Sequence, residues 1–398
     1  MLKRVILSNK GYPFIKKGQL WMYRNNLISA EEGIEDGDIV KIVSEDGEYL
    51  ATGFYSAVSH IAVRIVSREE KEEINSDYFR KQMEKACNYR KEVLKEAWDN
   101  CRLIYGEADG IPGLIVDRYN DVLVSQVSCK SIELRKEELY SVLTEILQKN
   151  GQIIHSVYER NDIKVREKEG LPLYKGYFCG AKESTETIIS ENGIKIRVDY
   201  EKGQKTGYFL DQKLNRKWVQ DFSKGLRVLD CFSHTGGFAL NAAKGNAKSV
   251  VAVDVSRTAL DQGFANACMN QLEDTITFVQ DDVFHYLDTL KEGDFDLIIL
   301  DPPAFTKSRR TIGHAYKGYK EINQKAMHVL KRGSYLASCS CSRYMEADLF
   351  YQMLLDAAKE ENVSLKPVTL QYQSPDHPIL ETMKETEYLK FYVFEIIK

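Results

Sequence analysis

Short apolar runs alternate with segments of helical periodicity from about residue 190 onward, and this alternation constrains the fold more than any other feature. The runs occur in "RVLDCFSHTGGFALNAA", "SVVAVDVSRTALDQGFANACMNQ", "ITFVQDDVFHYLDTL", "FDLIILDPPAF" and "SYLASCSCS". Such alternation predicts an α/β fold with a parallel sheet covered by helices on both faces. Ligands bind these sheets at the carboxyl ends of the strands, near the reversal of strand order. Because each run ends in polar or glycine-rich residues, we expect one shared site there.

Two smaller parts precede this region. Residues 1–70 alternate apolar and polar side chains around an Asp46-Gly47 turn, which predicts a hairpin in a compact β-rich module. The charged stretch that follows has helical periodicity and a cap at Asn75 or Ser76. The chain then mixes strands with a helix near Ser131–Lys149, as in an α+β domain. We therefore expect three domains, at residues 1–70, 71–185 and 186–398.

Basic residues gather in two segments of a chain whose net charge is −4. Residues 1–30 carry six Lys or Arg and no acid, and residues 302–332 carry eight against one acid, Glu321. Local basic faces can bind phosphates on an otherwise acidic protein. Ordinary solvated surfaces are the alternative interpretation of both segments.

The sequence contains no pattern of a membrane or secreted protein. Its longest strongly apolar runs, such as Leu297–Leu300, are far shorter than the roughly 20 residues that cross a bilayer. The N-terminal segment lacks the apolar centre of a secretory signal. Eight cysteines scattered over 398 residues are typical of reduced thiols rather than a disulfide scaffold. We expect a cytoplasmic protein without a membrane partner.

The first three strands end in residues suited to a nucleoside. Strand one ends in "LDCFSHTGGF", with Asp230 before the paired glycines Gly236 and Gly237, which permit a tight turn and close backbone approach. The spacing matches neither GxGxxG nor GxxxxGK[ST], which disfavours a phosphate cradle. Asp254 ends strand two, 24 residues after Asp230, where a carboxylate can accept hydrogen bonds from ribose hydroxyls. Asp281–Asp282 ends strand three and could receive an adenine amino group.

Strand four ends in "LDPPAF", Asp301 to Phe305. The two prolines fix the backbone and cannot donate to a strand ladder. This arrangement leaves the Asp301 carboxylate facing a cleft, with Phe305 able to stack on a flat ring. A rigid turn without a catalytic role is the alternative.

Strand five ends in "CSCS", which places Cys339 and Cys341 two residues apart on one side of a strand. A disulfide at this spacing would aim the side chains poorly. A zinc site would need two or more further ligands, no second cysteine pair appears and His377 alone is thin support, so no metal is expected. Core packing and a nucleophile remain. Cys341 ends the strand, facing the cleft of Asp301, whereas Cys339 lies deeper and is the better candidate for packing. A thiolate opposite a pyrimidine can attack C6 and activate C5, and Arg343 or a basic residue of 307–320 could lower the pKa of that thiol.

Over nearly its full length the chain resembles the bacterial 23S rRNA (cytosine-C5) methyltransferases, which join a PUA domain to a class I S-adenosylmethionine-dependent methyltransferase. The resemblance is carried by "IYGEADGIPGLIVDRYND", "KTGYFLDQKLNR", "LDCFSHTGGF", "VDVSRTALD", "DDVF", "LDPPAF", "GYKEIN", "SCSRYM" and "DHPI". It implies an N-terminal PUA-like RNA-binding domain, a central α+β domain and a Rossmann-like C-terminal domain. It also implies S-adenosyl-L-methionine as cofactor and 23S rRNA, free or partly assembled, as partner.

The same resemblance assigns roles to individual residues. It implies catalytic roles for Cys341 and Asp301. The cofactor would be held by residues at the strand ends: Asp230, Phe232, Ser233, Gly236, Gly237, Asp254, Asp282 and Asp301. The RNA would be contacted by residues of the Asp-Pro-Pro loop, of the cysteine loop and of the basic N-terminal segment: Pro302, Pro303, Phe305, Lys307, Arg343, Lys16 and Lys17.

Two departures and two alternatives stay open. The segment "TKSRRTIGHAYKGYKEIN" varies among relatives and leaves the target nucleotide undefined, and Cys339 is an extra cysteine. An Asp-Pro-Pro-aromatic motif also serves methylation of exocyclic amines of adenine or guanine, which needs no nucleophilic cysteine. A non-catalytic rRNA-binding assembly factor is the third interpretation. A homodimer, and the group that removes the C5 proton, are also left open.

Overall fold

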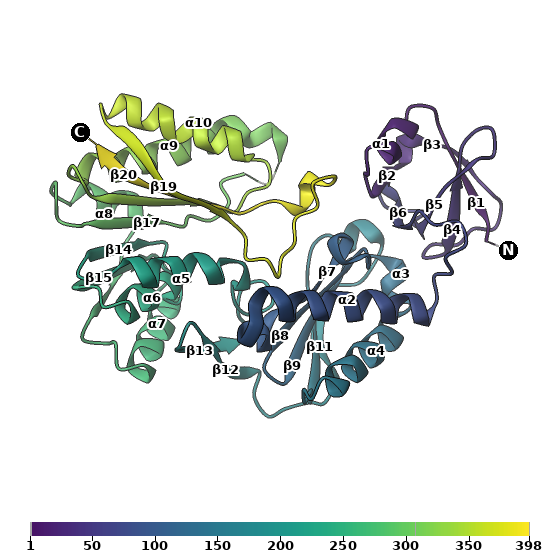
Figure 1. Ribbon diagram of the computed structural model, residues 1–398, viewed down its shortest axis with the longest axis horizontal. Coiled ribbons are helices and arrows are strands. Elements are labelled where there is room, and N and C mark those ends of the chain that lie inside the picture. Colours follow the sequence, from purple (N-terminus) through teal and green to yellow (C-terminus); the bar gives the residue numbers. More distant parts are fainter. Residues whose placement is uncertain (1, 307, 398) are drawn as a thin grey trace. The chain divides into compact units, whose positions relative to one another are not determined.

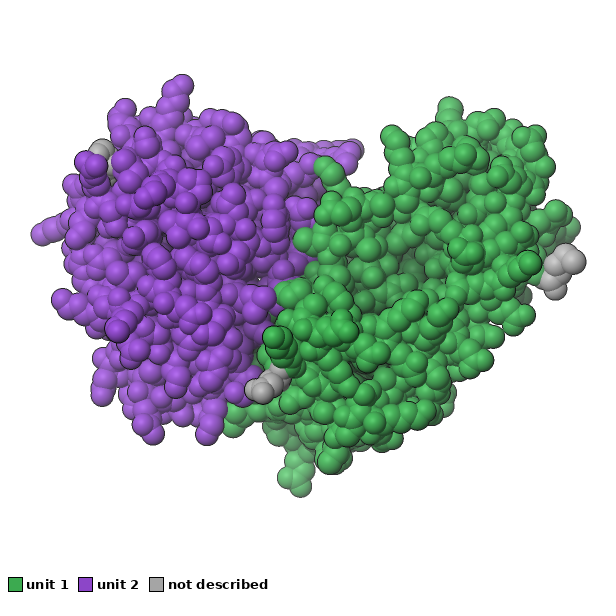
Figure 2. Space-filling view, viewed as in Figure 1, with its two compact units in different colours: residues 1–189, 198–210, 375–386 green, residues 190–197, 211–374, 387–398 purple. Residues whose placement is uncertain are grey.

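The computed structural model describes residues 2–306 and 308–397. The chain forms two compact units, each built from more than one stretch of sequence (Figure 2). Unit 1 contains Met1–Ile189, Val198–Leu210 and Pro375–Thr386, and unit 2 contains Ser190–Arg197, Asp211–Ser374 and Glu387–Lys398. Within the described residues, no helix combines the length and the apolar character that a membrane span requires.

The first part of unit 1 is a six-stranded sheet with its own small core. Its strand order is β2-β6-β5-β4-β1-β3, and the core contains Val5, Ile42 and Ile65. The predicted hairpin is confirmed, since β4 and β5 pair antiparallel and Gly47 takes the left-handed conformation with φ 84°. The strands are β1 (Arg4–Leu7), β2 (Trp21–Tyr23), β3 (Leu27–Ala30), β4 (Ile39–Val43), β5 (Tyr49–Tyr55) and β6 (Ile61–Ser67), and the short helix α1 spans Tyr12–Lys16.

The second part of unit 1 is a five-stranded sheet in the order β11-β10-β9-β8-β7, with α2 and α4 packed beside one another (Figure 1). Helix α2 begins where predicted, because the Asn75 side chain accepts the backbone N–H groups of Asp77 and Tyr78, both at 3.1 Å. The elements are α2 (Ser76–Leu94), β7 (Asn100–Tyr105), β8 (Leu114–Tyr119), β9 (Val122–Val127), α3 (Lys130–Glu133), α4 (Lys136–Lys149), β10 (Ser156–Asn161) and β11 (Tyr174–Cys179).

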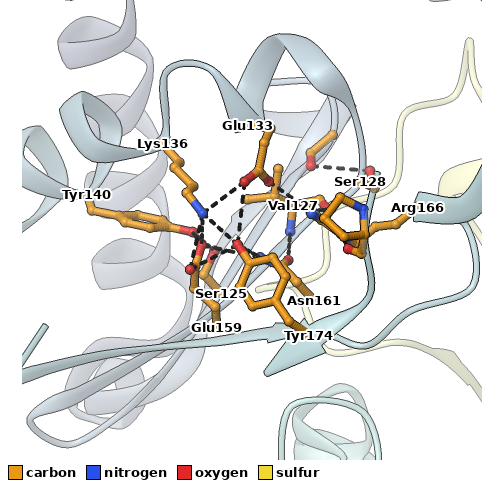
Figure 3. A network of polar contacts seen from close by, with 12 residues as sticks. Ser125, Val127, Ser128, Glu133, Lys136, Tyr140, Glu159, Asn161, Arg166 and Tyr174 are labelled. Carbon is orange, nitrogen blue, oxygen red and sulfur yellow. Dashed lines mark hydrogen bonds and ion pairs between the residues drawn. The ribbon is translucent and has the colours of Figure 1, made fainter. Parts of the chain in front are cut away.

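A partly buried polar network ties α3, α4, β10 and β11 together (Figure 3). Lys136 Nζ lies 2.9 Å from Glu133 Oε1 and 3.0 Å from Glu159 Oε1. Arg166, fully buried, donates to Glu133 at 2.9 Å and to the Val127 carbonyl at 2.7 Å. Because each buried charge has an opposite partner, the network fixes these elements without leaving an isolated charge in the core.

Two later segments of the chain return to unit 1. Arg160 donates to the carbonyls of Tyr200 and Gly203, and Asp376 accepts the Arg102 N–H at 3.0 Å. These bonds explain why residues 198–210 and 375–386 cluster with unit 1 although they follow residue 186. The strands β12 (Glu186–Glu191) and β13 (Ile194–Asp199) form a separate two-stranded sheet.

Unit 2 is a seven-stranded sheet in the order β16-β15-β14-β17-β18-β20-β19. The five predicted strands pair in parallel, as the alternation indicated, and two further strands pair antiparallel at one side. The strands are β14 (Arg227–Cys231), β15 (Ser249–Asp254), β16 (Ile276–Gln280), β17 (Leu297–Leu300), β18 (Tyr335–Ser340), β19 (Ser364–Tyr372) and β20 (Lys390–Ile397).

Helices cover both faces of this sheet (Figure 1). One face packs against α8, α9 and α10, whose apolar side chains form a single core with Leu229, Ile298 and Phe394. The other face packs against α5, α6 and α7, where Phe238 stacks on Phe391 at 5.9 Å between ring centroids. The helices are α5 (Lys213–Phe222), α6 (Gly237–Lys244), α7 (Arg257–Met269), α8 (Val283–Asp288), α9 (Ile312–Val329) and α10 (Ala347–Glu360).

Candidate active site at the carboxyl ends of the parallel strands

The strand order of unit 2 reverses at β14, which lies between β15 and β17. The carboxyl ends of these three strands therefore bring Asp230, Asp254 and Asp301 to one edge of the sheet. The Asp301 N–H donates to the Cys231 carbonyl at 3.4 Å, which joins the ends of β14 and β17 directly. This edge is where parallel sheets of this kind bind ligands.

The loop after β14 coils tightly through three residues in the left-handed region. Phe232, His234 and Gly236 have φ values of 62°, 52° and 80°. Such conformations are strained for Phe and His, and the surrounding hydrogen bonds must hold them. Asp230 Oδ2 accepts the Ser233 hydroxyl at 2.6 Å and the Ala239 N–H at 2.9 Å. The loop thus turns back over β14 and delivers the chain to α6, which begins at Gly237.

Asp254 and Asp282 keep oxygen lone pairs for a ligand. One Asp254 oxygen accepts the His234 N–H at 2.8 Å and the other accepts the Ser256 N–H at 2.9 Å, and the side chain is half-exposed. Each oxygen can accept a second bond, as two ribose hydroxyls would require. Asp282 caps α8 through one oxygen, which accepts the His285 N–H at 3.1 Å. These acids suit a nucleoside cofactor with donor groups and a positive charge.

Asp230 is buried beneath the loop, with only 1% of its surface exposed. Burial raises the pKa of its carboxyl group to about 7, and the charges of Asp301 and Asp254 add to that effect, while the bonds from Ser233 and Ala239 oppose it. Its second oxygen, Oδ1, is buried and has no hydrogen-bond partner. An approaching cation would stabilise the ionised form, so we expect the binding of a positively charged ligand at this edge to be coupled to Asp230 ionisation.

This coupling predicts a pH dependence of the affinity for a positively charged nucleoside cofactor. Because the carboxyl group titrates near 7 in the free protein, affinity should rise about tenfold from pH 6 to pH 8 as the proton leaves. Asp230→Asn should lose this dependence, while titration of the ligand itself stays the same in both proteins. Isothermal titration calorimetry across that range measures the difference, and parallel pH profiles for the two proteins would contradict it.

The pKa of Asp230 in the folded protein also lies above the reference value of 3.8, so the free energy of unfolding depends on pH. The native protein binds the proton more tightly, so its stability falls as pH rises from about 4 to 7. Thermal melting of Asp230→Asn without cofactor should show a weaker fall over that interval, which serves as a control that the substitution removes the same titration.

Gln212 orients the Asp301 carboxylate. Gln212 Nε2 donates to Asp301 Oδ2 at 3.1 Å, while its Oε1 accepts from Asn215 Nδ2 at 2.7 Å. The bond from Asn215 defines which end of the amide faces Asp301. Gln212 is only 3% exposed, so this contact is shielded from solvent. The sequence alone does not indicate this role of Gln212, although Gln212 and Asn215 are spaced by about one helical turn in "KTGYFLDQKLNR".

The serines on either side of Cys341 tie its loop to the rest of the site. Ser340 Oγ donates to the Tyr319 hydroxyl at 3.1 Å, and Ser342 Oγ donates to the Thr306 carbonyl at 3.1 Å. The loop that carries Cys341 is therefore joined both to α9 and to the segment that follows Asp301. Burial raises the pKa of Tyr319, and the charges of Cys341 and Asp301 raise it further, so both groups lie within electrostatic range of the same hydroxyl.

The two cysteines differ in depth. Cys339 is fully buried within β18, and burial raises the pKa of its thiol well above the usual value. A neutral, buried thiol of this kind packs as a small apolar group. Cys341 follows the last residue of β18 and is half-exposed. Its position fits a group that meets a substrate.

Of the predicted RNA-contacting residues in unit 2, Pro302 is buried and Pro303 is exposed. Phe305 packs one side against Tyr319, with ring centroids 4.6 Å apart and an interplanar angle of 44°, and is half-exposed. The exposed Arg343 lies over the Tyr344 ring at 4.8 Å. Lys307 lies outside the described residues.

The predicted lysines of unit 1 lie at the end of α1, where Lys16 and Lys17 are exposed. Two other basic residues of this domain are engaged in contacts within the protein. Arg4 pairs with Glu31 at 2.6 Å, and Arg24 donates to the carbonyls of Ser56 and Ser59. Lys10, like Lys16 and Lys17, is exposed, so these three lysines form the basic surface of α1 and its preceding turn.

Comparisons with known proteins agree with this geometry. Residues 176–392 match the model of the S-adenosylmethionine-dependent methyltransferase family, and residues 5–68 match that of a PUA-like domain. The ribosomal RNA large subunit methyltransferase I of Yersinia pseudotuberculosis is 36% identical over 401 residues, covering 100% of both chains. The protein of the same name from Yersinia pestis gives the same identity and coverage.

Solved structures share the fold. A Streptococcus mutans protein described as a SAM-dependent methyltransferase superposes with a TM-score of 0.81 and 21% identity, over 99% of this chain and 100% of the other. A methyltransferase complexed with SAH gives a TM-score of 0.83 and 20% identity, with the same coverage. The predicted α/β class, with a PUA-like domain before a methyltransferase domain, is confirmed.

Proposed function

The chain belongs to the S-adenosylmethionine-dependent methyltransferase family, and on that premise we propose that it methylates C5 of a cytosine in 23S rRNA through a covalent adduct of Cys341. The observation that carries this proposal is the half-exposed thiol of Cys341, whose loop is joined by Ser340 to Tyr319 of α9 and by Ser342 to the segment that follows Asp301. The similar Yersinia proteins are named for ribosomal RNA of the large subunit, which supports the substrate class. The proposal places the protein in the cytoplasm with its RNA.

The chemistry follows from the poor nucleophilicity of C5 in cytosine. When bound, S-adenosylmethionine supplies an electrophilic methyl group. The Cys341 thiolate attacks C6, which makes C5 an enamine-like carbon that takes the methyl group. Loss of the C5 proton then restores the ring and expels the thiolate. The Cys341 sulfur must therefore reach one face of the base, which the half-exposed position of Cys341 directly after β18 permits.

Asp301 would meet the Watson–Crick edge of the same base. As a protonated acid, its carboxyl group can donate to N3 at the N3/N4 edge of cytosine and neutralise the negative charge that thiolate addition to C6 places on the ring. Gln212 restricts that carboxyl group to one orientation through the 3.1 Å bond. Since a base within a duplex cannot enter such a site, the target cytosine must be unpaired or flipped.

The α1 lysines would contact RNA phosphates. Replacing Lys10, Lys16 and Lys17 together with Gln removes three exposed cations and should weaken RNA binding without changing S-adenosylmethionine affinity. The slope of log affinity against log salt should become shallower by about 2 to 3, because each phosphate contact contributes roughly 0.7–0.9. Filter binding of rRNA fragments at several salt concentrations measures this slope.

A charge-matched control separates local contacts from net charge. Lys85, Lys149 and Lys168 are also exposed in unit 1, and their joint replacement with Gln changes the charge equally. We expect this control to keep a slope near that of the wild type. Equal losses in both triple variants would contradict a dedicated basic surface on α1.

Product analysis tests the proposed function directly. rRNA from cells with and without this protein is digested to nucleosides, analysed by mass spectrometry and mapped for 5-methylcytosine. We expect one 5-methylcytosine that depends on the protein. An N-methylated adenine or guanine would support the exocyclic-amine alternative, and absence of any change, together with failure to bind S-adenosylmethionine, would support the non-catalytic one.

A further inference from the structure

Lys390 is a buried lysine beside the loop of Cys341. It is the first residue of β20, lies opposite Ser340 of β18 in the antiparallel register, and is 1% exposed. Burying an ammonium group is unfavourable unless neighbouring groups compensate for the lost hydration. Among the described residues, Lys390 makes no ion pair, so pairing with a carboxylate does not explain its burial.

The ammonium group of Lys390 instead binds two backbone carbonyls. Nζ donates to the carbonyl of Ser342 at 2.7 Å and to that of Tyr388 at 2.9 Å. Ser342 directly follows Cys341, and its hydroxyl in turn bonds the Thr306 carbonyl. The buried ammonium group of Lys390 therefore links Ser342, the residue next to the Cys341 thiol, to strand β20 near the C-terminus.

Few titratable groups surround Lys390. Burial lowers its pKa to about 8, and the charges of Glu387, Cys341 and Glu346 act in the opposite direction. These groups come from the segment before β20, the end of β18 and the start of α10, and β19 contributes Tyr372 opposite Lys390. The interaction with Cys341 must be reciprocal: if the thiolate favours the ammonium form, the ammonium form favours the thiolate.

We propose that Lys390 is a positioning residue for Cys341, which fixes the loop through the Ser342 carbonyl and supplies the positive charge that favours the thiolate. The proposal rests on the proposed function, in which Cys341 is the nucleophile. Sequence reasoning assigned this charge to Arg343 or to the 307–320 segment. Lys390 is better placed because it is buried and fixed by two hydrogen bonds, whereas Arg343 is exposed and lies over Tyr344.

Thiol alkylation tests the charge without RNA or cofactor. Iodoacetamide is applied between pH 6 and 9.5, and modification of each cysteine is measured by peptide mass spectrometry. The exposed Cys179 and Cys268 serve as references in the same molecule. In Lys390→Met the midpoint for Cys341 should move up by about one pH unit, with the references unchanged. Lys366→Met, which removes an exposed lysine of β19, should leave all three profiles unchanged.

A second variant separates the positive charge of Lys390 from its hydrogen bonds to the two backbone carbonyls. Lys390→Gln keeps N–H donors for the carbonyls but removes the positive charge, so the Cys341 profile should shift as in Lys390→Met. A wild-type profile in either folded variant would overturn the proposal, as would an equal shift of all three cysteines. Because alkylation needs no methyl transfer, a negative product analysis would refute the proposed function without deciding the role of Lys390.

Discussion

Cys341→Ala is expected to reduce methyl transfer by about 10³-fold or more while S-adenosylmethionine and RNA still bind. Without the thiolate, C5 of cytosine cannot become an enamine-like carbon, and the other thiol of this segment, Cys339, is fully buried. The acids proposed to hold the cofactor lie on β14, β15 and the loop before α8, so the substitution leaves them in place. Single-turnover methylation of an rRNA fragment, with separate binding measurements, checks both halves of this expectation.

Cys339→Ala is the matched control, since it removes the second thiol of "CSCS" two residues deeper in the same strand. Cys339 is fully buried, so this variant should lose some stability but retain methyl transfer in its folded fraction. An RNA carrying 5-fluorocytosine should trap the wild type as a covalent complex, because the fluorine cannot leave as a proton does. Undiminished turnover of Cys341→Ala would exclude covalent catalysis and favour methylation of an exocyclic amine.

The central parallel strands β14 and β17 could be predicted because they are buried on both faces and therefore form short, mainly apolar runs. The same reasoning placed Asp254 and Asp301 at strand ends and separated Cys341 from Cys339 by depth. These inferences needed only local sequence. They succeeded because parallel strands in a sheet of this type all point their carboxyl ends to one edge.

Long-range pairing could not be predicted in the same way. Strand β20 inserts antiparallel between β18 and β19, and this insertion brings Lys390 next to a loop 48 residues earlier. Gln212 reaches Asp301 across 89 residues. Neither contact leaves a periodic pattern in the sequence. A lysine at the start of an apolar strand and a glutamine before a helix both resemble ordinary surface residues. Only the fold shows that they are buried.

Charge counts have a similar limit. The six basic residues of 1–30 form one class in the sequence, but the structure divides them by partner. Arg4 pairs with Glu31 and Arg24 bonds two carbonyls, so both serve the sheet of the PUA-like domain. Because their partners lie 27 to 35 residues away, composition could not distinguish them from the exposed lysines of α1.

Asp301→Ala should be the second most damaging substitution, with a loss of about 10²–10³-fold in the rate of methyl transfer. The expected loss comes from the charge that thiolate addition places on the base, which the Asp301 carboxyl group would stabilise. Gln212→Ala should cost less, about tenfold, because it removes one hydrogen bond that orients the carboxyl group but leaves the group itself in place. Rapid-quench kinetics with saturating RNA and cofactor measure these rates apart from binding.

A double variant, Asp301→Ala with Gln212→Ala, tests whether the two residues act together. If Gln212 acts only by orienting Asp301, its removal should have no further effect once Asp301 is alanine, so the double variant should match Asp301→Ala. Asp301 could also contact the cofactor, since it shares an edge with Asp230 and Asp254. In that case S-adenosylmethionine affinity would fall together with the rate, and saturating cofactor would restore much of the activity. Two results together would indicate that Asp301 contacts the base rather than the cofactor. The rate of Asp301→Ala stays low at saturating cofactor, and adding Gln212→Ala lowers it no further.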